Sequence, residues 1–123
     1  MVTIGDVRAW AVSLPRSSEH LIHHRVKFRV GKIVYAAVSE DETTMGVGFP
    51  KEERDALVAA EPTKFSLPRP SDLRFHWVHA SMAELDVPEM RELVTDAWLM
   101  VVPKRLGAEH LLRIRGAMSR RRI

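Results

Sequence analysis

Residues Val26–Phe49 read VKFRVGKIVYAAVSEDETTMGVGF, and the expected fold depends on this segment. Apolar and polar residues alternate from Val26 to Val30, which is typical of a strand with one buried face. Gly31-Lys32 suits a two-residue type II′ turn, because glycine accepts the positive φ at the first central position. The apolar run Ile33–Val38 then forms the second strand of a predicted hairpin.

The hairpin also predicts which side chains share a face, because directly paired residues of two antiparallel strands do so. The predicted pairs are Val30–Ile33, Phe28–Tyr35 and Val26–Ala37. The opposite face would carry Arg25, Lys27 and Arg29, across from Val38, Ala36 and Val34. A slip of one residue would exchange the two faces, so the register stays open.

A third strand is predicted where Met45, Val47 and Phe49 alternate with smaller residues. Gly46 and Gly48 leave its other face nearly bare, so either a helix or a ligand packs closely there, and we favour the helix. If a ligand pocket exists, we expect it over Gly46 and Gly48, near Trp77.

The 123 residues fit one domain, and 46% hydrophobic and 28% charged residues are ordinary for a globular protein. No apolar run is long enough to span a membrane, no export signal opens the chain, and there is no cysteine. We therefore expect a cytoplasmic protein. Residues 104–123 hold seven basic side chains and one acidic one, whereas residues 1–103 hold 12 basic and 15 acidic ones. The net charge of +3 thus comes from a basic tail.

Three helices are predicted before the tail. Thr3 caps the first, with Asp6 completing a variant capping box, and Trp10 lies on its apolar stripe. A second helix begins at Pro50 and ends at Glu61-Pro62. The longest helix runs from near Val87 to Val102, with Asp86 and Glu89 as a capping box.

Further elements are less regular. Leu73–Ala80 is predicted to be a strand, with Phe75, Trp77 and His79 on one face. Arg16–His24 is predicted to be a polar connector whose histidines are solvated rather than metal-binding. A short amphipathic helix is expected from near Ala108, followed by fraying around Ser119–Arg122.

No pattern of catalytic residues is present. The chain lacks a nucleophile elbow, a phosphate-cradling glycine loop and a His-Glu-x-x-His motif, so we expect neither an enzyme nor a cofactor. Gly46-Val47-Gly48 matches only part of a dinucleotide fingerprint and lies inside a predicted strand.

Several short motifs occur in a characteristic order between about residues 3 and 106. They are Leu14-Pro15, Phe28–Ile33, Glu53-Arg54 before Leu57, Glu61-Pro62 before Phe65, Trp77-Val78, Asp96–Trp98 and Pro103–Leu106. Together they resemble the MmcQ/YjbR family, whose fold is similar to that of CyaY, the bacterial frataxin. Ser71–His76 departs from this pattern, since family members tend to carry glycine before the tryptophan.

The resemblance implies a single small α+β domain over residues 1–106. Residues 107–123 lie outside the resemblance and are expected to form a basic extension that is partly helical and then frayed. Its antiparallel sheet would have about four to five strands, packed by an N-terminal helix and a long C-terminal helix. Family members look like predicted DNA-binding proteins with a double-wing arrangement. No catalytic residue is carried over.

Two functions follow as expectations. The first is non-enzymatic DNA binding through a basic hairpin and the basic tail. Its candidate residues are Arg25, Lys27, Arg29, Lys32, Arg69, Arg74, Arg113, Arg115, Arg120, Arg121 and Arg122. The alternative is a small-ligand or protein-interaction module of frataxin-like shape. Iron delivery is not expected, because the first helix carries only Asp6 beside Arg8.

Overall fold

Six antiparallel strands form one sheet in the order β1-β2-β3-β4-β6-β5, and helices cover one of its faces. The computed structural model describes residues 1–121, with side chains as far as Ile114. The elements are α1 (Ile4–Ala11), β1 (Ser17–Ile22), β2 (Arg25–Val30), β3 (Ile33–Val38), β4 (Thr44–Gly48), α2 (Lys51–Ala60), β5 (Phe65–Ser66), the 3₁₀ turn η1 (Pro70–Asp72), β6 (Trp77–Ser81), α3 (Val87–Leu99) and α4 (Lys104–Arg121). The predicted α+β class is confirmed, with one strand more than expected.

The additional strand is β1, and the prediction of a polar connector over Arg16–His24 is therefore wrong. All six residues of β1 pair with β2. His23 and His24 form the turn between them, with φ of 51° and 64°. Positive φ at both central residues is the type I′ geometry that joins twisted strands. Ser17–Ile22 shows no clear apolar alternation, so only its backbone pairing with β2 reveals it as a strand.

The β2–β3 hairpin confirms the predicted turn but not the whole predicted register. Gly31 has φ of 60°, and Val30 pairs with Ile33. A bulge at Tyr35 then shifts the pairing by one residue, so that Phe28 lies opposite Ala36 and Lys27 opposite Ala37. The bulge lets the Tyr35 hydroxyl reach Ser17 Oγ at 2.5 Å, on the helix-covered side.

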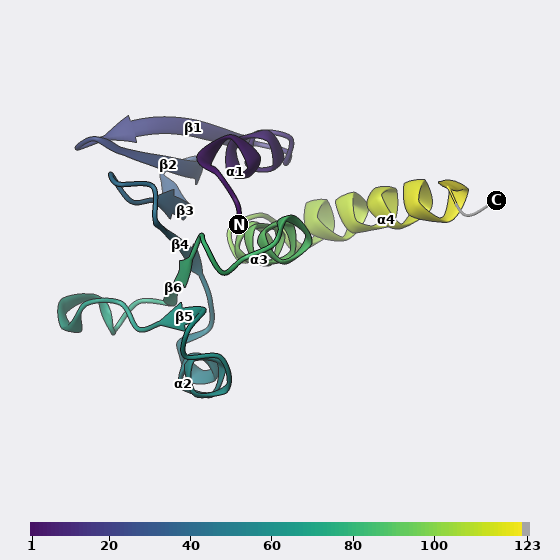
Figure 1. Ribbon diagram of the computed structural model, residues 1–123. Coiled ribbons are helices and arrows are strands. Elements are labelled where there is room, and N and C mark those ends of the chain that lie inside the picture. The colour runs from purple at the N-terminus through teal and green to yellow at the C-terminus, as the bar shows by residue number, and fades with distance from the viewer. Residues whose placement is uncertain (122–123) are drawn as a thin grey trace.

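The hydrophobic core lies between the sheet and the helices α1 and α3 (Figure 1). Phe28, Val38, Met45, Val47, Val78 and Trp98 are among its fully buried residues. Both helix tryptophans also make hydrogen bonds: Trp10 Nε1 donates to Thr95 Oγ1 and Trp98 Nε1 donates to the Pro15 carbonyl, each at 2.9 Å. These bonds fix α1 and its C-terminal turn against α3.

The predicted capping box is present in full at α1 but only in part at α3. Thr3 and Asp6 form a reciprocal capping box at α1. At α3, Asp86 accepts from the Glu89 amide, but the Glu89 carboxylate pairs with Lys64 at 2.5 Å. The predicted capping box at α3 is therefore only half formed, because Lys64 competes for the Glu89 carboxylate. The helix ends at Leu99, three residues earlier than predicted.

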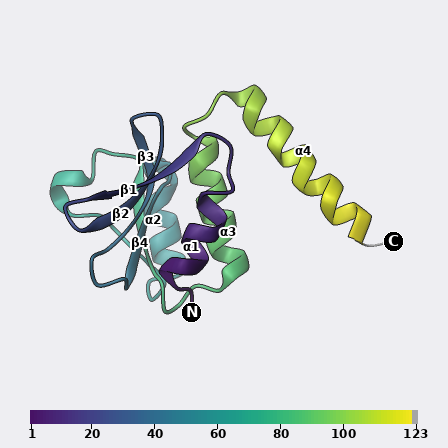
Figure 2. The ribbon, with the colours of Figure 1, turned by 90° about the horizontal axis from the view of Figure 1, so that it is seen from above.

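Within residues 1–121, no helix lies on the opposite side of the sheet, and we call this side the open face. Figure 1 shows α1 and α3 on one side, while the segment between β5 and β6 curls out on the other. Figure 2 shows the same separation from above, with α4 extending away from the body of the domain on the helix-covered side. Helix α4 begins at Lys104 rather than near Ala108 and continues through Gly107 and Gly116 to Arg121. Arg122 lies outside the described residues.

Strand β6 begins at Trp77, so the predicted strand start at Leu73 is wrong. Residues 70–76 form η1 and a loop instead, which places Phe75 off the sheet and half exposed. Trp77 and His79 do share the open face, as predicted, while Val78 and Ala80 enter the core. No helix in residues 1–121 combines the length and apolar character that crossing a lipid bilayer requires.

Candidate functional site

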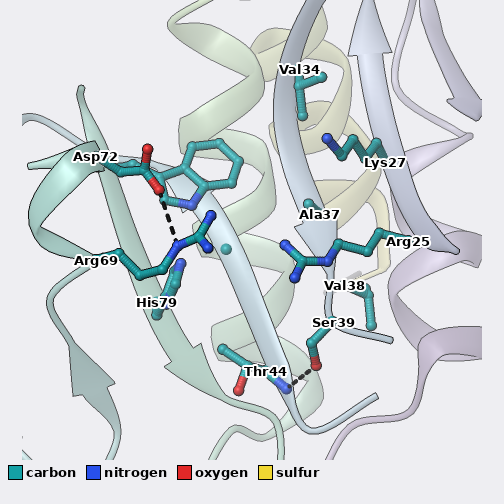
Figure 3. Close-up of a pocket in the computed structure, with 12 residues that line it drawn as sticks. Arg25, Lys27, Val34, Ala37, Val38, Ser39, Thr44, Arg69, Asp72 and His79 are labelled. Carbon is teal, nitrogen blue, oxygen red and sulfur yellow. Dashed lines mark hydrogen bonds and ion pairs between the residues drawn. The ribbon is translucent and has the colours of Figure 1, made fainter. Parts of the chain in front are cut away.

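Three of the predicted basic residues converge on the open face. Arg25 and Lys27 project from β2, and Arg69 comes from the segment that precedes η1. Together they line a cavity of about 410 Å³, which we call the cationic cavity. Its remaining lining includes Ser39, Thr44, Gly46, Asp72, Trp77 and His79. Figure 3 shows the guanidinium groups of Arg25 and Arg69 turned toward one another across this cavity.

The cations of this cavity outnumber its carboxylates. Asp72 pairs with Arg69 at 3.6 Å, and the Arg69 side chain is largely exposed while that of Asp72 is partly exposed. Within residues 1–114, neither Arg25 nor Lys27 has a carboxylate within 4.0 Å. Burial lowers the pKa of His79; nearby Arg69 and Arg25 lower it further, while Asp72 opposes the change. An anion placed here would be attracted by two cations that have no counterion among the described side chains.

Trp77 separates the cationic cavity from a second one. Its indole ring covers Gly46, where an added Cβ would lie 2.5 Å from Trp77 Nε1. Gly48 lies instead under α3, since a Cβ there would meet the Cβ of Ala97 at 3.6 Å. The helix expected over these glycines is thus present at Gly48, whereas a side chain from the neighbouring strand covers Gly46.

The second cavity, of about 540 Å³, is mainly apolar, and we call it the apolar cavity. It opens where β3 and β4 diverge, because these strands pair only from Ala36 to Val38. Its lining comprises Lys27, Ile33, Val34, Tyr35, Gly48, Asp72, Phe75, His76, Trp77, Ala97, Met100 and Val101. Ile33, Phe75 and Met100 are 56%, 50% and 45% exposed. Three large apolar side chains therefore surround one opening.

Arg54 organises this region, a role that the sequence analysis did not assign. Its guanidinium is buried and donates to the carbonyls of Leu73, Phe75 and Trp77 at 2.9–3.0 Å. These three carbonyls belong to the loop between the two cavities and the start of β6. The sequence offered one signal for this role: Arg54 lies three residues before Leu57 and four before Val58, so it shares the apolar side of the predicted helix.

The other predicted basic residues do not join the cationic cavity. Arg29 contacts His20 at 3.0 Å and 3.2 Å, Arg74 lies over the Phe75 ring at 4.7 Å, and Lys32 lies exposed in the hairpin turn. The tail cations Arg113, Arg115, Arg120 and Arg121 belong to α4. Since α4 extends on the helix-covered side, the hairpin and the tail form two separate basic regions (Figures 1 and 2).

The histidines of the β1–β2 hairpin were predicted to be solvated rather than metal-binding. His20 lies on β1 and binds Ser18 Oγ at 2.8 Å as well as Arg29. His23 and His24 are exposed in the turn. In the part of the chain that the structure describes, no three His, Asp or Glu side chains are placed to hold a metal ion.

The fold and the site define a small α+β domain with a cation-lined, helix-free sheet face. The family model YjbR matches residues 12–100, and the chain belongs to the YjbR family. Its fold is similar to the crystal structure of the Deinococcus radiodurans protein DR2400, which is assigned to the domain family DUF419. The TM-score is 0.73 at 22% identity, covering 87% of this chain and 89% of that chain. No curated protein matches the chain.

Proposed function

We propose that this protein binds DNA, without catalysis, through the open face of its sheet. The observation that carries the proposal is the convergence of Arg25, Lys27 and Arg69 on one cavity from two distant parts of the chain. Phosphate groups are the commonest partners of such cations in protein–DNA contacts, and they supply most of the sequence-independent affinity.

The charge distribution supports a local contact rather than a general attraction. Residues 1–103 carry more acidic than basic side chains, so the body as a whole repels a polyanion. On the open face, however, Arg25 and Lys27 have no carboxylate partner among the described side chains and would attract phosphate locally. The basic tail adds attraction from a second direction, since α4 extends away from this face.

A small anionic ligand is the second candidate function. The two cavities favour it, because both fall within the range of about 300–1,000 Å³ typical of small-molecule sites. Isothermal titration with mononucleotides and other aromatic anions tests this candidate directly. Binding at micromolar concentration by a free mononucleotide would favour it over DNA.

The DNA proposal is tested by the salt dependence of binding. Fluorescence anisotropy with labelled 20-nucleotide DNA, single-stranded and duplex, is measured between 50 and 200 mM salt. We expect the variant Arg25→Gln/Lys27→Gln/Arg69→Gln to bind about tenfold or more weakly and to lower the log–log salt slope by about two to three, one for each lost phosphate contact.

A matched control removes the same charge elsewhere. Arg16→Gln/Lys51→Gln/Arg91→Gln changes three exposed cations that lie outside both cavities and outside the basic tail. The control should keep most of the affinity of the unmodified protein. Equal losses in the two triple variants would show that only net charge matters, and the assignment to the open face would then be wrong.

A further inference from the structure

The cationic and apolar cavities adjoin one another and share four lining residues, Lys27, Val34, Asp72 and Trp77. A ligand that fills both would need a negative group on one side of the Trp77 indole and an apolar, planar body on the other. A nucleotide unit of a nucleic acid strand has this combination, because each planar base is linked through its sugar to flanking phosphates.

We infer that DNA binds as a single strand, with the flanking phosphates at Arg25, Lys27 and Arg69 on the open face. One unstacked base would enter the apolar cavity, which lies where β3 and β4 diverge, beside the C-terminal end of α3. This inference rests on the proposed DNA-binding function and specifies its substrate. In a duplex the bases are stacked inside the helix, so only phosphates and groove edges could meet this surface. A duplex would leave the apolar cavity unfilled.

The rim of the apolar cavity supports a base rather than an aliphatic group. Phe75 is half exposed and already carries the Arg74 guanidinium over its ring at 4.7 Å, so one aromatic face is used in a cation–π contact. Ile33 and Met100 complete an exposed apolar rim. Base stacking on aromatic side chains is the usual source of affinity in proteins that bind single strands.

The imidazole of His76 at the same rim can meet the hydrogen-bonding edge of a base. His76 Nδ1 accepts from the Lys51 amide at 3.0 Å, which leaves its Nε2 as the donor in the neutral ring. A base in the cavity would therefore meet the His76 donor at its edge while its ring lies against apolar side chains.

The test compares single-stranded and duplex DNA of the same sequence with the full-length protein. We expect the single strand to bind at least about tenfold more tightly, and Phe75→Ala to remove most of that difference while leaving duplex binding unchanged. Leu21→Ala is the matched control, because Leu21 is a 72% exposed apolar residue outside both cavities. It should change neither affinity.

A second measurement needs no protein variant. A strand of abasic residues keeps every phosphate but has no base to enter the cavity, so its affinity should fall to about that of the duplex. Tryptophan fluorescence should also be quenched by the normal strand and not by the abasic one. Equal affinity for normal and abasic strands would overturn the inference.

The outcomes separate the inference from the proposed function. Duplex binding as tight as single-strand binding, with the same dependence on Arg25, Lys27 and Arg69, would overturn the single-strand inference and leave DNA binding intact. If the unmodified protein binds neither single-stranded nor duplex DNA at low salt, both the single-strand inference and the proposed DNA-binding function are wrong. A free mononucleotide that binds as tightly as the strand would replace DNA with a small ligand.

Discussion

The indole ring of Trp77 lies directly on Gly46, so closely that a Cβ at residue 46 would be 2.5 Å from Trp77 Nε1. The two residues lie on neighbouring strands, β6 and β4. Because residue 46 has no side chain, the ring can lie flat on the sheet between the cationic and apolar cavities. This contact fixes the shape of both cavities.

Gly46→Ala should lower the free energy of unfolding by about 1–3 kcal/mol, because the new methyl group forces the indole to move. Gly48→Ala is the matched control, since its Cβ would make only ordinary contact with Ala97 at 3.6 Å. Urea denaturation of both variants measures the difference. In a Trp77→Leu background the cost of Gly46→Ala should shrink, and an unchanged cost would contradict the proposed clash.

Arg54→Lys should destabilise the domain by about 2–3 kcal/mol, because a single ammonium nitrogen does not reproduce the positions of the two guanidinium nitrogens that bind the three carbonyls. Hydrogen exchange should rise at residues 73–77 before the core strands are affected. Lys51→Met is the control: Lys51 contacts the same loop through the Arg74 carbonyl but is exposed, and its contact is long at 3.5 Å. Equal effects of the two variants would contradict the role assigned to Arg54.

Protonation of His79 should destabilise the folded protein. Burial, together with Arg69 and Arg25, lowers its pKa in the folded state despite the opposing effect of Asp72. The unfolded chain then binds more protons, so stability should fall as the pH drops through about 6.5, the usual pKa of histidine. His79→Gln should flatten this part of the curve, although His110, whose pKa is also lowered, titrates in the same direction.

The control for this pH dependence is His23→Gln, because His23 lies exposed in the β1–β2 turn. Thermal unfolding between pH 7.5 and 5 gives the comparison. A curve for His79→Gln that follows the unmodified protein would rule out His79 as a contributor.

Asp72→Asn should strengthen DNA binding by about threefold to tenfold, because it removes the carboxylate of the cationic cavity and frees Arg69. Stability should change by less than about 1 kcal/mol, since Arg69 is largely exposed and its pair with Asp72 is long at 3.6 Å. Asp55→Asn, which removes an exposed carboxylate from α2, is the matched control for net charge. Fluorescence anisotropy at a fixed salt concentration gives the DNA affinity of the unmodified protein and of both variants. Weaker binding by Asp72→Asn would contradict a phosphate site in the cationic cavity.

Truncation after Leu112 should lower the salt slope of DNA binding, because it removes Arg113, Arg115 and Arg120 to Arg122. Since α4 extends away from the open face, this effect should add to that of Arg25→Gln/Lys27→Gln/Arg69→Gln. Circular dichroism checks that the truncated domain stays folded. Strong non-additivity would show that the tail and the open face bind the same phosphates.

Much of the architecture was accessible from local patterns. The alternation in Val26–Val30, the glycine turn at Gly31 and the caps at Thr3 and Asp86 each depend on neighbouring residues, and the structure confirms them. The register beyond Ala36 was not accessible in this way. Every residue of Ile33–Val38 is apolar or aromatic, so no alternation marks the bulge at Tyr35.

Two other predictions, the connector over Arg16–His24 and the strand start at Leu73, were wrong because local patterns did not reveal a long-range contact. Strand β1 has no clear apolar face, and it is a strand because its backbone pairs with β2. Residues 73–76 show strand-like alternation, yet they form a loop because the buried Arg54 holds the carbonyls of Leu73 and Phe75. In both cases the deciding contact comes from a residue distant in the sequence.

The sequence alone therefore determined the fold class, the helix caps, the hairpin turn and which β2 side chains are cationic, since each follows from local periodicity and turn chemistry. Only the tertiary structure brought Arg69 opposite Arg25, laid Trp77 on Gly46 and directed the basic tail away from the hairpin. These arrangements depend on how β4 and β6 pair and on how one buried arginine holds a loop. Such long-range contacts have no periodic signature in the chain.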